Sequence, residues 1–154
     1  MGDVRVCQFL ICDFDSSMEP YSHICEMDVS NNDLAELPRG ICDMKANLMR
    51  LAADHNNLTT LPEFLTCLGK LEILSVQSNR INALPALAGL DSLKEMDLSN
   101  NKLEGLPDSL VLLPSLQRLD LRFNILVRQL CGDIQLVYNH VIWLTVCGPE
   151  IDTK

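Results

Sequence analysis

The sequence lacks the features that would direct a protein to or through a membrane. Its first residues, MGDVRVCQFLICDF, contain no basic segment followed by an apolar core and a small-residue cleavage site, so they do not resemble a signal peptide. Val6 also breaks the myristoylation pattern that Gly2 would begin. The longest apolar stretch, LVYNHVIWLTVC, is too short for a membrane helix and contains Asn139 and His140. We therefore expect a soluble protein without a membrane span, located in the cytoplasm, with the nucleus as the alternative.

Motifs for catalysis and for metal or cofactor binding are also missing. The chain has no phosphate-binding glycine loop, no HExxH and no GxSxG. Its three histidines, His23, His55 and His140, are widely separated. The seven cysteines are odd in number, scattered and without CxxC spacing, which favours free thiols in a reducing compartment. We expect no enzymatic activity, no cofactor and no metal site.

Basic residues are scarce relative to acidic ones. The chain has 12 lysines and arginines against 21 aspartates and glutamates, which gives a formal net charge of −9. A protein that binds the phosphates of nucleic acids needs a surface rich in lysine and arginine. We therefore do not expect nucleic acid to be the principal ligand.

The sequence contains one short pattern that occurs five times. Internal repetition of this kind is the strongest sequence indication of a repeat fold. Residues 24–38 read ICEMDVSNNDLAELP and residues 93–107 read LKEMDLSNNKLEGLP. In every copy an apolar residue stands at positions 1, 4, 6 and 11, and an asparagine stands at position 9. The copies, numbered here as the first to fifth coils, are 22 to 24 residues apart and begin at Ile24, Leu48, Leu71, Leu93 and Leu116.

The spacing within a copy predicts a short strand followed by a turn. Positions 4 and 6 lie on one face of an extended chain, and positions 3, 5 and 7 lie on the other. The period of two ends at the asparagine, a residue that tolerates turn conformations. A Leu-Pro pair closes the first four copies, and apolar residues then recur every three positions, as at Leu65, Leu68 and Leu71. This spacing indicates short helical turns on the return path.

The pattern LxxLxLxxNxL resembles that of leucine-rich repeats. The Leu-Pro ending and the coil lengths resemble the intracellular Ras-suppressor, Scribble and Shoc-2 group, and the short third coil is similar to the phosphatase-regulating Sds22 type. The resemblance implies an α/β fold, a solenoid curved like a horseshoe, with parallel strands on the concave face and short helical or 3-10 turns on the convex face. It also implies a ladder of asparagine side chains that bonds the backbones of adjacent coils, formed by Asn32, Asn56, Asn79, Asn101 and Asn124.

The register covers nearly the whole chain, so residues 1–154 are predicted to form a single domain with five clear repeats in residues 24–126. Counting back 23 residues from Ile24 puts Phe9 in the asparagine position, which makes residues 1–23 a degenerate N-terminal capping coil.

Residues 127–154 are predicted to form the C-terminal cap, with a last strand from VIWLTV. Two registers are possible for this strand. Counting 23 residues from Leu116 puts Leu144 at position 6, whereas a slip of two residues puts Leu144 at position 4.

The outward positions 3, 5, 7 and 8 define the candidate binding surface. Across these positions there are six acidic residues and three arginines, so we expect a protein partner with a net basic surface. Ile73 in the middle of the array, and Arg118, Arg122 and Phe123 at its end, are residue types that often dominate interfaces. The candidate partner-binding residues are Glu26, Asp28, Arg50, Asp54, His55, Ile73, Ser75, Gln77, Glu95, Asp97, Arg118, Asp120, Arg122 and Phe123.

The relatives implied by the resemblance are scaffolds and regulatory subunits. We therefore expect a non-catalytic protein–protein interaction module that binds its partner on the concave face. The alternative is a regulatory or assembly subunit of an enzyme, such as a phosphatase, or of a ribonucleoprotein complex. The repeat residues are structural, so they identify neither the partner nor the oligomeric state.

Overall fold

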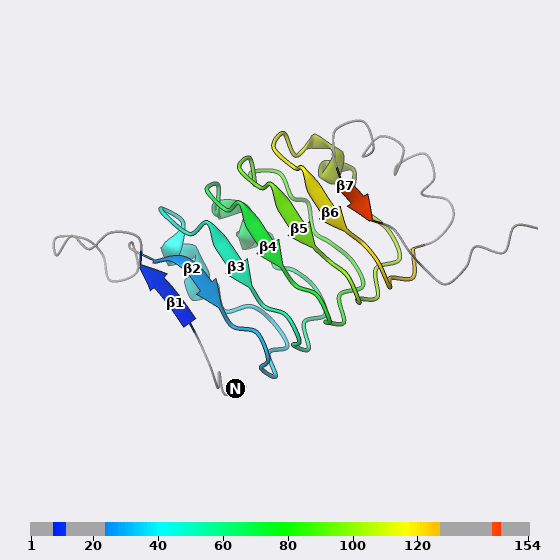
Figure 1. Ribbon diagram of the computed structural model, residues 1–154, viewed down its shortest axis with the longest axis horizontal. Coiled ribbons are helices and arrows are strands. Elements are labelled where there is room, and N and C mark those ends of the chain that lie inside the picture. The colour runs from blue at the N-terminus through cyan, green and yellow to red at the C-terminus, as the bar shows by residue number, and fades with distance from the viewer. Residues whose placement is uncertain (1–7, 12–23, 127–142, 146–154) are drawn as a thin grey trace, which may run out of the picture.

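The chain forms a seven-stranded sheet whose strand order follows the sequence order (Figure 1). The computed structural model describes residues 8–11, 24–126 and 143–145. The strands from β2 onward pair in parallel, because each coil returns behind the sheet before the next strand begins. The strands are β1 (Gln8–Ile11), β2 (Ile24–Asp28), β3 (Arg50–Ala52), β4 (Ile73–Ser75), β5 (Glu95–Asp97), β6 (Arg118–Asp120) and β7 (Trp143–Thr145).

Neighbouring strands align position by position, as the repeat predicts. Position 4 of one coil always pairs with position 4 of the next, so Leu51, Leu74, Met96 and Leu119 form one row across the sheet. Positions 3 and 5 form parallel rows on either side of it. The sheet therefore presents the same position of every repeat along a single line.

The apolar positions of the repeat form the core between the strands and the return segments. In the third coil Leu71, Leu74, Val76 and Ile81 are all fully buried, with 0% of their surface exposed. One coil has no second layer of its own, so its apolar face is covered by the coils before and after it. The burial of this face drives the stacking.

The ladder of asparagines is confirmed in the structure. The Asn101 amide nitrogen Nδ2 donates to the carbonyl oxygens of Val76, Leu98 and Ser99 at 3.0–3.2 Å. Its oxygen Oδ1 accepts the backbone N–H of Ile81 in the preceding coil at 2.9 Å. One side chain thus pairs backbone carbonyl and N–H groups in the turn of its own coil and in the preceding coil. Leaving such groups buried without a partner would destabilise the fold.

The other ladder asparagines repeat this arrangement. Asn56, Asn79 and Asn124 each donate to carbonyls in two coils and accept one N–H from the coil before. Asn32, in the first coil, donates to the carbonyls of Val29 and Ser30. All five predicted asparagines therefore hold the turns that follow the strands.

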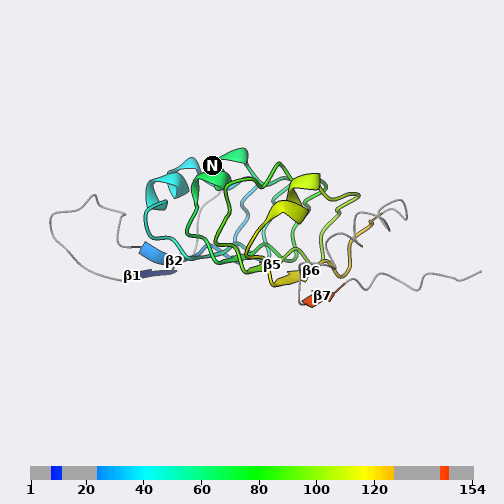
Figure 2. The same cartoon turned by 90° about the horizontal axis from the view of Figure 1, so that it is seen from above.

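The return segments contain short 3-10 helices, which confirms the predicted helical turns. They are η1 (Arg39–Met44), η2 (Glu63–Cys67) and η3 (Asp108–Leu112), and they lie on the side opposite the strands (Figure 2). Each begins directly after the proline of a Leu-Pro pair, because a proline has no N–H to leave unpaired at a helix start and its φ is already suitable. Within the described ranges, no helix has the length and apolar character needed to cross a membrane.

The third coil returns by a different path. Residues 85–92, all of them described, contain no helix. Gly89 adopts φ +105°, and a Cβ atom at this residue would lie 2.8 Å from the Thr66 carbonyl oxygen of the second coil. The absence of a side chain at Gly89 therefore allows this shorter coil to pass close to its neighbour.

The predicted register of the N-terminal coil is wrong. Strand β1 runs antiparallel to β2 and places Phe9 opposite Met27, so Phe9 lies in a strand and not in the asparagine position of a parallel coil. An antiparallel strand can pair with the edge of β2 without a return segment, which a coil would need. The rest of residues 1–23, and with it the predicted cap, lies outside the described residues.

The C-terminal strand resolves the two registers left open by the sequence. Strand β7 is parallel to β6, and Leu144 pairs with Leu119, so Leu144 occupies position 4. The register with a slip of two residues is correct. The remainder of the predicted cap in residues 127–154 lies outside the described residues.

The expectation that all the cysteines are free thiols is also wrong. Cys25, buried in β2, is disulfide-bonded, whereas Cys42 and Cys67 are free. The spacing of the cysteines gave no sign of this bond, because pairing depends on how the segments meet in space. The other four cysteines lie outside the described residues.

Candidate interaction surface

A row of outward side chains at position 3 crosses the middle of the sheet. The pairing of the strands aligns Glu26, Arg50, Ile73, Glu95 and Arg118 in this row. In β7, Trp143 pairs with Arg118 by backbone register. Trp143 is absent from the predicted site because the register of its strand was open.

The three arginines of the concave face are each paired with an acid of the same face. Across coils, Arg50 Nε lies 3.9 Å from Glu26, and Arg118 Nη1 lies 3.1 Å from Glu95. Within the fifth coil, Arg122 Nη2 lies 2.6 Å from the Asp120 carboxylate. Such exposed pairs stabilise a fold by only about 0.2–1 kcal/mol. Their main effect is to neutralise part of the acidic surface.

Three acids at position 5 accept hydrogen bonds from their own backbones. In the first, fourth and fifth coils the Oδ1 atom of the aspartate accepts the N–H of position 7, two residues later, at 2.8–3.0 Å. This local turn is typical of aspartate. The pairs are Asp28 with Ser30, Asp97 with Ser99, and Asp120 with Arg122.

The second and third coils have no acid at position 5, and a neighbouring coil supplies the acceptor. The Asp54 N–H donates to Ser30 Oγ of the first coil at 3.0 Å. The Gln77 N–H in turn donates to Asp54 Oδ1 at 3.0 Å, and Ser75 Oγ donates to the same oxygen at 2.6 Å. Asp54 therefore stabilises the coil that follows it. Four of the acids predicted to bind a partner thus have a structural role as well.

Position 8 has a backbone property that the sequence reasoning missed. All five residues at this position are in the left-handed region, with φ between 54° and 58°. Asparagine tolerates this region better than most residues, and its presence at position 8 of two coils was a signal that could have revealed it. The residues are Asn31, His55, Ser78, Asn100 and Phe123.

Phe123 combines a strained backbone with an exposed ring. Its φ is 56° and 64% of its surface is exposed. A bulky residue in the left-handed region costs about 1–3 kcal/mol. We expect Phe123→Asn to raise the free energy of unfolding by about 1 kcal/mol and the melting temperature by roughly 2–4 °C, as measured by thermal unfolding.

The control for this prediction is Ile125→Asn. Ile125 is similarly exposed, at 57%, but its φ is not positive, so the change removes apolar surface without relieving strain. It should leave the melting temperature unchanged. Equal gains from both variants would show that the backbone at Phe123 is not strained.

The structure gathers part of the predicted site around a hollow of about 230 Å³ over β4, β5 and β6. Its walls include Ile73, Glu95, Asp97 and Arg118. Ile73 therefore lies beside charged groups of the next two strands in this hollow. The predicted residues of β2 and β3 lie along the same face but outside this hollow.

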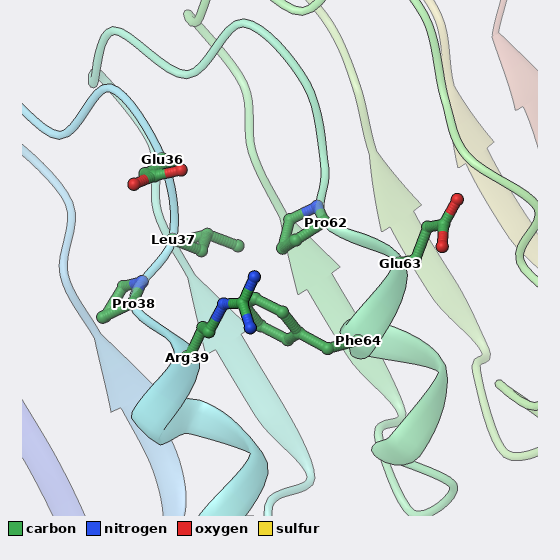
Figure 3. Close-up of a pocket in the computed structure, with 7 residues that line it drawn as sticks. All are labelled: Glu36, Leu37, Pro38, Arg39, Pro62, Glu63 and Phe64. Carbon is green, nitrogen blue, oxygen red and sulfur yellow. The ribbon is translucent and has the colours of Figure 1, made fainter.

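A larger pocket of about 540 Å³ lies away from the predicted site, where the first and second coils begin their return segments (Figure 3). Arg39 of η1 and Phe64 of η2 extend toward each other across it, with Glu36 and Glu63 at its rim. None of these residues belongs to the repeat pattern, so the sequence reasoning did not find the pocket. Among the described residues, no group of three or more His, Cys, Asp or Glu is placed to hold a metal ion.

Comparisons with known proteins agree with the repeat and the fold. The family model for the leucine rich repeat matches residues 70–126. The adenylate cyclase of Schizosaccharomyces pombe is 36% identical over 110 residues, which cover 68% of this chain and 6% of the cyclase. The mouse leucine-rich repeat and calponin homology domain-containing protein 1 is 39% identical over 94 residues, covering 60% of this chain and 13% of the mouse protein.

A third relative, transforming growth factor beta activator LRRC32 of Pongo abelii, is 36% identical over 116 residues, covering 73% of this chain and 17% of that protein. The chain thus corresponds to a small part of each relative. Among solved structures, a leucine-rich repeat protein of Leptospira interrogans superposes with a TM-score of 0.68 at 26% identity, covering 80% of this chain and 32% of that one. Five in-register repeats, a parallel sheet with an asparagine ladder and these likenesses lead to one conclusion: the chain is a leucine-rich repeat protein.

Proposed function

We propose that this chain is a non-catalytic interaction module that binds a protein partner on the concave face of its sheet. Leucine-rich repeat domains generally mediate protein–protein interaction, and the family and fold are typically non-catalytic. The observation that carries the proposal is the row of side chains at position 3. Within the described part of the chain, the charged side chains of this row form ion pairs with one another, across coils, and accept or donate no hydrogen bond to the backbone. They are therefore available for recognition at little cost to the fold, because exposed ion pairs contribute only about 0.2–1 kcal/mol.

The chemistry of this face favours a partner with a net basic surface. The outward positions carry six acids against three arginines, and each arginine is already paired. Among the described residues, Asp28, Asp54 and Asp97 have no ion-pair partner. Ile73 supplies an apolar anchor in the central hollow. A basic partner with an apolar contact at its centre would match this arrangement.

The size of the face suits another protein. Neighbouring strands lie about 4.8 Å apart, so five strands span roughly 20–25 Å. A face of this width can contribute on the order of 800 Å² to an interface, which is one side of a standard protein complex. Either a folded domain or an extended segment would fit.

Variants at position 3 test the proposal by surface plasmon resonance, after the partner has been captured with the wild-type chain and identified. We expect Ile73→Ala to accelerate dissociation by about 10-fold, because apolar anchors at interface centres control dissociation. We expect Glu95→Lys to slow association several-fold, with the difference shrinking as salt is added, because exposed charges steer encounter. Asp97 and Asp120 are less informative sites because they accept backbone hydrogen bonds.

Asp108→Lys is the matched control, since it makes the same kind of charge reversal on η3 of the convex face. It should change neither rate. If Asp108→Lys abolishes binding while Ile73→Ala and Glu95→Lys leave both rates unchanged, the partner uses the convex face and the proposed site is wrong.

The alternative function is a regulatory or assembly subunit of an enzyme, such as a phosphatase, or of a ribonucleoprotein complex. The identity of the captured partner decides between the two functions.

The resemblance to the Ras-suppressor, Scribble and Shoc-2 group and the cytoplasmic location stay predictions. The disulfide at Cys25 argues against that location, because disulfides persist mainly in oxidising compartments. Fractionation of cells that express the chain would test it.

A further inference from the structure

Two free cysteines meet on the convex face. Cys42 lies in η1 and Cys67 in η2, the 3-10 helices of the first and second coils, which pack against each other. The Cys67 thiol donates a hydrogen bond to Cys42 Sγ, and the two sulfur atoms are 2.8 Å apart. Sulfur atoms in a disulfide are about 2.05 Å apart, so bond formation would bring these two closer by about 0.8 Å.

The surroundings of the pair leave it open to a reagent. Cys67 is exposed and Cys42 is half-buried. Cys42 Sγ also donates to the Phe64 carbonyl oxygen at 3.5 Å, which holds the Cys42 side chain beside the second coil. The repeat pattern requires no thiol at either position, because neither residue belongs to the apolar positions that form the core.

We propose that Cys42 and Cys67 are a site of oxidative modification, at which a small disulfide oxidant such as glutathione disulfide converts the two thiols into an intramolecular disulfide that links the first two coils. This site is on the opposite side of the coils from the proposed binding face. It is therefore independent of the proposed function, and either can fail without the other.

The reaction proceeds by two thiol–disulfide exchanges. The Cys67 thiol loses its proton to water, and the thiolate attacks one sulfur of glutathione disulfide. This forms a mixed disulfide on Cys67 and releases one glutathione thiolate, which takes up a proton. The Cys42 thiol then loses its proton and attacks Cys67 Sγ, which forms the Cys42–Cys67 bond and releases the second glutathione. The two protein thiols are oxidised and glutathione disulfide is reduced to two thiols.

The order of attack follows from the environments of the two thiols. Burial, together with the adjacent Cys67 thiol, raises the pKa of Cys42 to about 11. Only a small fraction of Cys42 is therefore ionised near neutral pH, and the thiolate is the nucleophile. Cys67 is in addition the more exposed of the two. Cys67 thus reacts with the external oxidant, and Cys42 completes the bond from 2.8 Å away, where proximity compensates for its weak ionisation.

The test is to equilibrate the reduced whole chain with a mixture of reduced and oxidised glutathione, alkylate the remaining thiols at low pH and map the peptides by mass spectrometry. We expect more than about half of the molecules to carry the Cys42–Cys67 link. In Cys42→Ser, which lacks the second thiol, glutathione should instead remain attached to Cys67. In Cys67→Ser the link should be absent and Cys42 should be recovered unmodified.

Thermal unfolding adds a readout of the new bond. Closing a loop between residues 42 and 67 restricts the unfolded chain, so the melting temperature of the wild type should rise by roughly 5–10 °C on oxidation. Cys42→Ser serves as the reference, because any effect of the Cys25 disulfide is common to both chains.

The proposal is overturned if, in the wild type, Cys42 and Cys67 are both recovered in the alkylated form. It is also overturned if glutathione accumulates on Cys67 while Cys42 is alkylated. Both outcomes are read in the unmutated protein, so they do not depend on how well a variant folds.

Discussion

Replacement of Leu74 by alanine is expected to lower the free energy of unfolding by about 3–5 kcal/mol. Leu74 is fully buried in the central strand β4, and its row neighbours in the sheet are Leu51 and Met96. The shorter side chain loses its own burial and leaves a cavity with rigid backbone on both sides. Because a domain is stable by only about 5–15 kcal/mol in total, this single change should shift the urea midpoint substantially.

Leu112→Ala is the matched control. Leu112 lies in η3 with 73% of its surface exposed, so the same change there removes almost no buried surface. Its effect should stay within about 0.5 kcal/mol. If Leu74→Ala and Leu112→Ala unfolded at the same urea concentration, the assignment of position 4 to the core would have to be abandoned.

Asn101→Ala is the second change with a large expected effect, about 2–3 kcal/mol. Asn101 Oδ1 is the acceptor for the Ile81 N–H, and alanine leaves this buried donor without its partner. The Val76 carbonyl oxygen, by contrast, keeps the bond from Asn79. The loss is therefore concentrated at the turn of the third coil. Urea denaturation monitored by circular dichroism gives the difference directly.

Two further variants separate the parts of this effect. Asn101→Asp keeps an acceptor for Ile81 but cannot donate to the three carbonyls that the amide contacts, and a buried charge is costly, so it should destabilise at least as much as alanine. Asn100→Gly changes the exposed neighbour without straining φ 54°, and should cost less than about 0.5 kcal/mol. The ladder interpretation is refuted if Asn100→Gly is as harmful as Asn101→Ala.

Much of this fold could be predicted because the repeat encodes it in residue types at fixed spacing. Leucines at positions 1 and 4 and asparagine at position 9 each have one physical role, and Leu71, Leu74 and Asn79 perform it in the structure. The direction of a strand, by contrast, is not encoded by the spacing of residue types. Alternating apolar residues around Phe9 predict a strand but not whether it runs with or against its neighbour, so β1 was assigned to the wrong register. The disulfide at Cys25 likewise depends on contacts between segments and not on spacing.

The candidate site could be predicted only as a face. Alternation predicts which residues point outward, and the hollow around Ile73 and Glu95 lies within that set. It does not predict which outward residues are needed by the backbone. Asp97 and Glu95 are both acids on the same strand, yet Asp97 accepts the Ser99 N–H whereas Glu95 pairs with Arg118. The pair Cys42 and Cys67 was beyond sequence reasoning, because the distance between adjacent return segments depends on how the coils stack.

The hydrogen bonds from Ser75 and Gln77 to Asp54 have a consequence for how this surface can evolve. In most coils an aspartate of the same coil accepts the backbone N–H of position 7. In the third coil this hydrogen bond is accepted by Asp54 of the second coil. A mutation of Asp54 would therefore damage a turn that lies 23 residues further along the chain. Position 5 of the second coil, Ala52, likewise has no acceptor role, because Ser30 Oγ of the first coil accepts the Asp54 N–H. When a neighbouring coil supplies the acceptor in this way, position 5 of the coil that receives it can vary without loss of the turn, and in this chain that position lies on the proposed binding face.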